Sequence, residues 1–251
     1  MLGIGSSLAG GAALEETYSL SLDGNSDFAS GNVSTLNSLT DFSISLWFHF
    51  TASIPTSNEP ILVMGGTAGS NRFYLQLLNS TTLRTPTNAY DGGTDNIVID
   101  GDDDHGISEF VQDTWYHITR TQDGGAVKLY LNAVEIGSWT TNAPGNAIGT
   151  SFHIGAYALN NAGSEGFFFQ GYIDDVATWD VALSAASVLA AYNNAVPFDL
   201  TNNRGNYTNA SDLAAYWRMN DGTGSTITDS SGNGKDLTLS GTAGFSTVIP
   251  Y

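Results

Sequence analysis

Apolar and polar residues alternate with a period of two along much of the chain. Between positions 41 and 51, one series of alternate residues is apolar: Phe42, Ile44, Leu46, Phe48 and Phe50. The intervening series is Ser43, Ser45, Trp47, His49 and Thr51. Successive side chains of a β-strand point to opposite faces, so this alternation predicts a strand with one face in the core.

Further short strands are predicted by the same criterion at residues 18–22, 72–78, 115–121, 127–132, 152–155 and 167–179. Gly, Asn and Asp separate them, and the gap at residues 122–126 has the length and glycine content of a hairpin turn. Many short strands joined by such turns indicate an all-β protein, folded as an antiparallel two-sheet sandwich or jelly roll.

Only one segment has the pattern of a helix. Ser184 can cap the alanine-rich run at residues 185–195, and the asparagine pair near its end favours termination. We expect one short helix that closes an end of the sandwich.

The net charge of the chain limits the classes of molecule that we expect it to bind. The 251 residues include 25 Asp and Glu but only 7 Lys and Arg, a formal net charge of −18. Binding to nucleic acid or to an anionic membrane needs clustered basic residues, so we expect neither partner. A membrane-spanning helix requires about 18 consecutive apolar residues, and no segment of the sequence has such a run, so none is expected. With no cysteine, disulfides and thiolate metal sites are excluded.

The chain divides by composition into three parts. Residues 1–16 are rich in Gly, Ala and Ser and predict a flexible arm, either an unstructured terminus or a docking peptide. A signal peptide is not expected, because it would require basic residues and no Lys or Arg precedes Arg72. Residues 17–196 form the predicted jelly roll. Residues 197–211 are polar and Asn-rich, and the strand-forming part that follows, residues 213–241, is too short to be stable alone. We therefore expect residues 197–251 to pack on the same sandwich or on a neighbouring subunit.

Four segments carry a family resemblance: YSLSLDG, DFSISLWF, DTWYHITRTQDGGAVKLYLNAVEIGS and FQGYIDDVATWDVALS. Together they resemble laminin G-like and pentraxin-like domains of the concanavalin A-like jelly-roll superfamily. The resemblance implies a two-sheet antiparallel jelly roll. The segment AYWRMNDGTGSTITDSSGNGKDLTLSG resembles a piece that precedes the first strand in many such domains. Here it lies near residue 251, which implies a permuted order or strands donated to another subunit.

A second resemblance concerns function. The Gly-rich start, the laminin G-like body and the YWRMNDGTG sequence resemble structural proteins of marine bacteriophage particles. This implies a non-catalytic display or attachment protein of the virion, a capsid decoration or fibre, with other virion subunits as partners and a homo-oligomeric state. The alternative is an extracellular carbohydrate-binding module of a secreted or cell-surface protein that binds a cell-surface glycan.

An enzyme is not expected. Glycosidases of this fold carry an E-x-D-x-E strand, and the chain has no such pattern, no G-x-S-x-G, no P-loop and no H-E-x-x-H. The four histidines, at positions 49, 105, 117 and 153, are widely spaced and are expected to be ordinary strand residues.

The family resemblance implies one structural cofactor, a calcium ion. In related jelly rolls, calcium joins the first strand to the last, and the matching residues are Asp23 and Asp174. The alternative is that Asp23 serves a turn and Asp174 is a solvated strand position.

The ligand-binding residues stay unassigned by the sequence. A glycan site needs aromatic rings, and Trp139, Tyr157 and residues 167–169 are the candidates nearest to predicted loops. The alternative is that these aromatics belong to the core.

Overall fold

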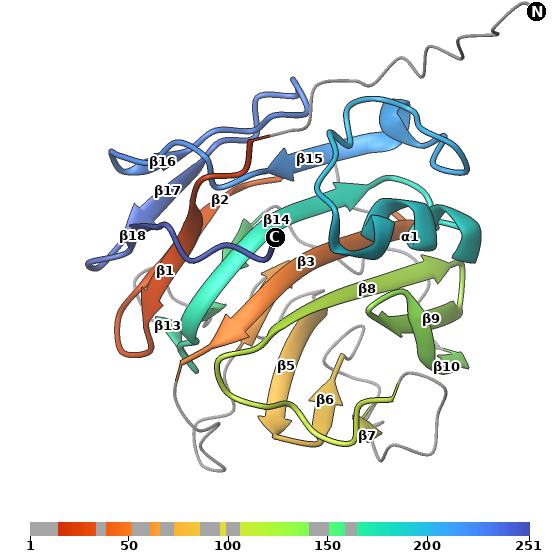
Figure 1. Cartoon of the computed structure of the whole chain (residues 1–251), viewed down its shortest axis with the longest axis horizontal. Coiled ribbons are helices and arrows are strands. Elements are labelled where there is room, and N and C mark those ends of the chain that lie inside the picture. Colours follow the sequence, from red (N-terminus) through yellow and green to blue (C-terminus); the bar gives the residue numbers. More distant parts are fainter. Residues whose placement is uncertain are drawn as a thin grey trace, which may run out of the picture.

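The structure is a computed structural model that describes residues 15–33, 39–51, 61–65, 73–85, 96–98, 106–140, 151–158 and 165–251. The described residues form two antiparallel sheets stacked face to face, with one short α-helix (Figure 1). The predicted all-β, two-sheet, concanavalin A-like sandwich is therefore confirmed. No helix in the described part of the chain is long and apolar enough to span a membrane.

Sheet A contains, in spatial order, β10 (Val134–Thr140), β9 (Ala126–Leu131), β8 (Trp115–Asp123), β3 (Phe42–Phe50), β14 (Gln170–Trp179), β1 (Ser19–Asp23) and β18 (Gly244–Ser246), and β15 (Leu213–Trp217) also pairs with β14. Sheet B contains β16 (Thr226–Ile227), β17 (Leu237–Ser240), β2 (Phe28–Asn32), β11 (Ser151–Ile154), β4 (Ile61–Gly65), β5 (Phe73–Asn79), β6 (Thr82–Arg84) and β7 (Asn96–Val98). A small hairpin of β12 (Tyr157–Ala158) and β13 (Glu165–Gly166) forms a separate two-stranded sheet, which packs against sheet B through the rings of Tyr157 and Tyr74 at 5.5 Å.

The core between the sheets follows the predicted alternation. The five apolar residues of β3 are all buried in it: Phe42, Ile44, Leu46, Phe48 and Phe50. Facing residues from sheet B include Phe73, Leu75, Phe152 and Ile154. The intervening residues of β3 therefore lie on the other face of sheet A, which we call the outer face.

Strand β14 carries a β-bulge at its centre. Asp174 lies opposite Trp47, but Ala177 lies opposite Ser45, so β14 has one residue more than β3 over this interval. Asp175 takes up the extra length with a positive φ of 46°. The bulge helps to place two successive aspartates where they meet side chains of the outer face.

The helix α1 (Ala185–Tyr192) begins where the sequence predicts. The Ser184 hydroxyl accepts a hydrogen bond from the Ser187 N–H at 3.1 Å, which caps the helix, and Asn193 ends it in the left-handed conformation. Short 3₁₀ turns follow at Asn193–Ala195 and Ala210–Asp212. Together with α1, these segments cover part of the outer face through a second apolar cluster that includes Trp179 and Tyr207. The expectation that the helix closes an end of the sandwich is therefore wrong, because its apolar side packs on the face of sheet A.

Residues 197–251 add strands to both sheets of their own chain. β15 pairs with β14, β17 pairs with β2, and β18 pairs with β1. Figure 1 shows β18 beside β1 and β17 beside β2 at one side of the sandwich, and β15 alongside β14. Donation of the same strands to a neighbouring copy stays a prediction.

Of the predicted N-terminal arm, residues 1–14 lie outside the described residues. Glu16 is buried and pairs with Arg218, whose Nε donates to its carboxylate at 3.0 Å. The described end of the arm therefore packs against the segment that follows β15.

Candidate functional site

A row of aromatic side chains crosses the outer face of sheet A, and we call it the aromatic row. Strand pairing places His49 of β3 opposite both Tyr172 of β14 and Trp115 of β8. The ring centroid of His49 lies 5.4 Å from the ring centroid of Tyr172 and 5.2 Å from that of Trp115. Trp115 and Tyr172 are half-buried, whereas His49 is buried between them. Part of both flanking rings therefore reaches solvent.

The aromatic row is electrically neutral near pH 7. Burial lowers the pKa of His49 below its usual value, in spite of nearby backbone acceptors and Asp113, which act to raise it. A neutral imidazole between two aromatic rings forms a surface with little charge to attract ions. Such a surface suits an uncharged ligand with apolar faces.

Polar side chains border the aromatic row at the edge of the sheet. Asp23 lies opposite Gln170, two positions before Tyr172, and both are exposed. On the other side, exposed Asp113 and Thr114 precede Trp115. These groups can donate or accept hydrogen bonds at the rim of a ligand that lies on the rings.

Asp23 itself stabilises a turn. Its Oδ1 accepts hydrogen bonds from the N–H groups of Asn25, Ser26 and Asp27 at 2.8–3.1 Å. Slight desolvation acts to raise its pKa, but these backbone donors outweigh it and hold the pKa below the usual value. Asp23 is thus ionised and partly committed to the turn.

A second row lies next to the aromatic row, and we call it the inner row. It consists of Asp174, Trp47 and His117, which oppose one another across β14, β3 and β8. The two rows are two residues apart along β3, which is about 6.8 Å. Unlike the aromatic row, the inner row is buried, with Trp47 only 5% exposed.

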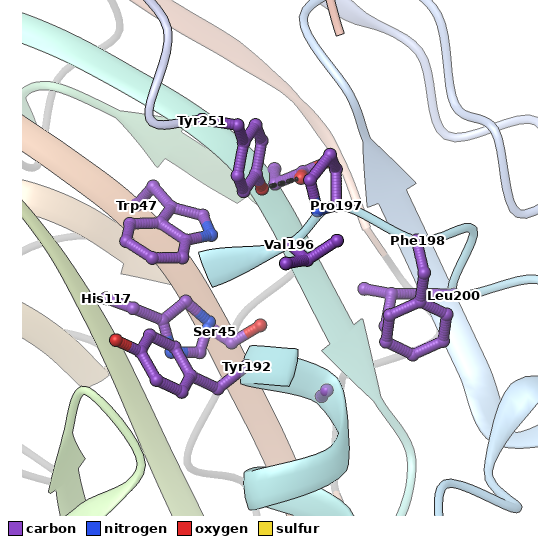
Figure 2. A pocket seen from close by; sticks show the side chains of 11 residues that line it. Ser45, Trp47, His117, Tyr192, Val196, Pro197, Phe198, Leu200 and Tyr251 are labelled. Atoms are coloured by element: carbon purple, nitrogen blue, oxygen red, sulfur yellow. Dashed lines mark hydrogen bonds between the residues drawn. The ribbon is translucent and has the colours of Figure 1, made fainter. Parts of the chain in front are cut away.

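Two tyrosines from distant parts of the chain cover the inner row. The ring of Tyr192, at the end of α1, stacks on Trp47 at 5.6 Å, and the ring of Tyr251 meets Trp47 edge-on at 5.6 Å. Figure 2 shows these rings turned toward one another around the pocket. The remaining cavity is about 20 Å³, with Ser45 and Asp175 also in its lining. It has room for about one water molecule.

Buried polar atoms of the inner row have no hydrogen-bond partner among the described residues. They are Nδ1 of His117 and Oδ2 of Asp174. Burial lowers the pKa of His117 to about 3, so its imidazole is neutral. Burial, followed by repulsion from Asp175 and Glu16, raises the pKa of Asp174 well above its usual value.

Asp175 differs from Asp174 in having partners for both oxygens. The hydroxyl of Tyr216 donates to Oδ1 at 2.8 Å, and the hydroxyl of Tyr251 donates to Oδ2. Burial is also the main cause of its raised pKa. Near Asp174 and Asp175, the carboxyl of Glu16 has its pKa raised to about 7, first by burial and then by Asp175.

The structure does not bring Asp23 and Asp174 together. Asp23 lies opposite Gln170, and Asp174 is four residues further along β14, about 13 Å away. Among the described residues, no three acidic or histidine side chains are grouped as a metal site requires. One calcium ion shared by Asp23 and Asp174 therefore does not fit this geometry, while the binding of calcium as a structural cofactor stays a prediction.

The aromatic residues favoured by the sequence analysis lie elsewhere. Tyr157 and Phe167 belong to the β12–β13 hairpin region, where their rings meet edge-on at 5.6 Å. Phe169 is buried in the core, and Trp139 is half-buried against it. Phe167 is 39% exposed, so the hairpin offers a second and smaller aromatic surface.

The sequence analysis missed the aromatic row. It placed Trp47 and His49 on the non-core face of their strand, which is correct. Trp115 and Tyr172 occupy equivalent outward positions on β8 and β14. Aromatics at outward positions of several strands were the available signal, but only the strand register shows that they meet.

Fold and site together define an all-β lectin-like sandwich with aromatic side chains on the outer face of one sheet. A family model described as the Concanavalin A-like lectin/glucanases superfamily, of laminin G type, matches residues 22–189. The chain therefore belongs to this superfamily, as the resemblance predicted. No curated protein matches the sequence.

Solved structures support the same fold. A protein from Bacteroides ovatus ATCC 8483, named for a proposed carbohydrate-binding role, is similar with a TM-score of 0.66 and 16% identity, over 94% of this chain and 61% of that one. The Ruminococcus gnavus IT-sialidase CBM40 gives a TM-score of 0.54 at 15% identity, over 72% and 99% of the two chains. The heptameric SAP-like pentraxin of Limulus polyphemus gives 0.53 at 14% identity, over 72% and 84%. This chain thus spans about three fifths of the Bacteroides protein.

Proposed function

We propose that this chain is a carbohydrate-binding module that binds a neutral glycan on the aromatic row. The observation that carries the proposal is the alignment of Tyr172, His49 and Trp115 across three paired strands, with both outer rings partly open to solvent. The C–H faces of sugar rings stack on aromatic rings, and the polar rim can bond to their hydroxyl groups. The net charge of −18 favours a neutral glycan over an acidic one.

Similar folds with glycan-related names support this proposal. One structure of the Ruminococcus gnavus CBM40 is bound to α2,3-sialyllactose, with a TM-score of 0.52 to this chain. That ligand is acidic, so the likeness supports glycan binding but not the neutral charge that we propose for the glycan. The Bacteroides ovatus protein is also named for carbohydrate binding. These likenesses concern the fold, and the aromatic row supplies the argument about this chain.

We propose binding without catalysis, although the superfamily name includes glucanases. Glycoside hydrolysis needs two carboxyls that reach the sugar from solvent. Near the aromatic row, Asp174 is fully buried and Asp175 is engaged by Tyr216 and Tyr251. Neither of these two carboxyls is exposed to a ligand on the row. Exposed Asp23 and Asp113 flank the row on β1 and just before β8, three strand spacings or about 14 Å apart, which is more than a pair of catalytic carboxyls uses.

Substitution of Trp115 tests the proposal. A glycan array followed by titration calorimetry identifies a neutral oligosaccharide and its Kd. Trp115→Ala removes one face of the platform, and we expect at least a tenfold weaker Kd, equivalent to about 1.4 kcal/mol. Tyr172→Ala should act in the same direction.

The hairpin aromatics provide the matched control. Tyr157→Ala and Phe167→Ala alter partly exposed rings away from sheet A, and we expect an unchanged Kd. Circular dichroism of each variant verifies that the fold is retained. Loss of binding in the hairpin variants with normal binding by Trp115→Ala would place the site on the hairpin and contradict our assignment. Absence of any glycan binding would refute the function.

The virion hypothesis finds no support in the comparisons, and it stays a prediction, as do a homo-oligomeric state and the location on a particle or outside a cell. It does not conflict with glycan binding, because a particle can attach through a glycan. Co-purification in fixed stoichiometry with capsid or fibre proteins is the measurement that checks the virion hypothesis.

Calcium binding is checked by calorimetric titration of the metal-free chain and of Asp174→Asn.

A further inference from the structure

The inner row repeats the design of the aromatic row one step further along the same strands. Trp47 takes the place next to His49 on the outer face of β3, and His117 takes the place next to Trp115 on β8. The two imidazole–indole pairs have similar centroid distances, 5.0 Å and 5.2 Å. A ligand of two or more rings lying along β3 would pass from one row to the other.

The inner row contains unmatched hydrogen-bonding capacity. His117 is 4% exposed, yet its Nδ1 has no partner among the described residues, and the same holds for Oδ2 of the fully buried Asp174. A buried polar atom without a partner destabilises the folded state, and each such atom calls for an explanation. Burial lowers the pKa of His117 to about 3 and raises the pKa of Asp174 well above its usual value, so burial favours the neutral form of each group, which suits hydroxyl groups rather than ions.

An aromatic ring of the chain itself fills the place that a ligand would take. Tyr251 lays its ring edge-on against Trp47 and donates its hydroxyl to Asp175 Oδ2. In Figure 2 the ring lies beside Trp47, on the side of the pocket opposite Tyr192. A six-membered ring that carries a hydroxyl group is a fair substitute for a sugar ring in size and hydrogen bonding.

Few described hydrogen bonds hold this ring in place. Ladder pairing of β18 with β1 ends at Ser246. Beyond it, the Val248 carbonyl accepts a bond from the Ser19 hydroxyl at 2.6 Å, and Tyr251 bonds to Asp175. Val248 is 37% exposed. Residues 247–251 can therefore leave the outer face without breaking a strand pair of sheet A.

We propose that the inner row is a second sugar subsite, which Tyr251 occupies in the absence of ligand and from which a neutral oligosaccharide displaces it. The subsite consists of Trp47, Asp174 and Asp175, and the ring of Tyr192, which covers His117, forms its wall on the side of α1. It rests on the proposed function, since it extends the aromatic row from one ring to at least two. Displacement of Tyr251 opposes binding, so the ring sets the affinity for longer glycans.

The test compares Tyr251→Ala with the unaltered chain on neutral gluco-, xylo-, manno- and arabino-oligosaccharides of one to six rings. By calorimetry, we expect Tyr251→Ala to bind oligosaccharides of two or more rings five- to tenfold more tightly. Monosaccharide affinity should stay unchanged, because one ring fits on the aromatic row alone. Tyr251→Phe keeps the ring but loses the bond to Asp175, and a smaller gain is expected.

Two further variants separate this inference from the proposed function. Trp47→Ala should abolish the gain from Tyr251→Ala while leaving monosaccharide binding intact. If the chain binds glycans through Trp115 but Tyr251→Ala shows no gain for longer ligands, the second subsite is wrong and the proposed function stands. If no variant binds any oligosaccharide, both are wrong. Thermal unfolding of each variant checks that the fold survives.

Discussion

At the scale of single residues, the most unusual feature is a group of buried carboxyls around β14. Asp174 and Asp175 are consecutive, and Glu16 is close enough to raise the pKa of Asp174. Arg218 compensates only part of this charge, through its ion pair with Glu16. Because a buried ionised carboxylate without a partner is costly, the fold favours the protonated form of Asp174.

The raised pKa of Asp174 predicts how the free energy of unfolding depends on pH. A carboxyl whose pKa is higher in the folded state binds its proton more tightly there, so its contribution to stability is full below the unfolded pKa of 3.8 and is lost as the pH rises through the folded pKa. Asn resembles a protonated Asp but cannot ionise. We therefore expect Asp174→Asn to gain stability relative to the unaltered chain as the pH rises from 4 to 8, by at least about 1 kcal/mol.

The comparison must be made at each pH by urea unfolding. Histidines act in the opposite direction: burial lowers the pKa of His117 to about 3, so stability is lost as the pH falls below 6.5. That contribution is common to both proteins and cancels in their difference. Exposed Thr114, which carries no ionisable group, provides the control, and Thr114→Ala should show no trend with pH. A constant difference between Asp174→Asn and the unaltered chain would contradict a raised pKa.

At the scale of elements, the register between β3 and β14 determines the aromatic row. Gly171 lies directly opposite Phe50, next to the Tyr172–His49 pair. Its φ of 148° is unfavourable for other residues, and a Cβ there would lie 2.0 Å from the backbone carbonyl oxygen of His49. Glycine at this position therefore allows the two strands to approach closely enough to align their side chains.

Gly171→Ala should disturb this register. We expect a loss of several kcal/mol in the free energy of unfolding, because both backbone strain and the overlap with His49 must be relieved. Gly124→Ala is the matched control: it also has a positive φ, 54°, but open space around its Cβ, so about 1 kcal/mol is expected. Urea unfolding measures both. Equal losses would mean that the contact with His49 does not matter.

The same elements show what the sequence could and could not reveal. Alternation in β3 and the Ser184 cap of α1 are local patterns, and both were predicted correctly. The contacts of His49 with Trp115 and Tyr172 join strands far apart in sequence, so no local pattern contains them. The bulge at Asp175 also depends on the partner strand.

At the scale of the whole molecule, residues 197–251 act as part of the sandwich. Trp217, at the end of β15, is fully buried in the main core. Its ring stacks on Phe152 of sheet B at 5.0 Å, and its Nε1 donates to the Lys235 carbonyl at 2.7 Å. One side chain from this segment thus links the two sheets.

Trp217→Ala tests whether the segment and the body fold as one unit. Removal of a fully buried indole leaves a large cavity, and we expect a loss of about 3–5 kcal/mol with a single unfolding transition. Leu189→Ala is the control: the Leu189 side chain lies on α1 and is 55% exposed, so its loss should change stability by less than about 0.5 kcal/mol.

Circular dichroism and limited proteolysis monitor the body and the segment separately. If Trp217→Ala releases residues 197–251 to protease while the body keeps its stability, the segment is an independent extension. Light scattering of the same samples then measures the mass of the assembly in solution. Strand donation by residues 197–251 would hold copies together, so release of the segment would lower that mass.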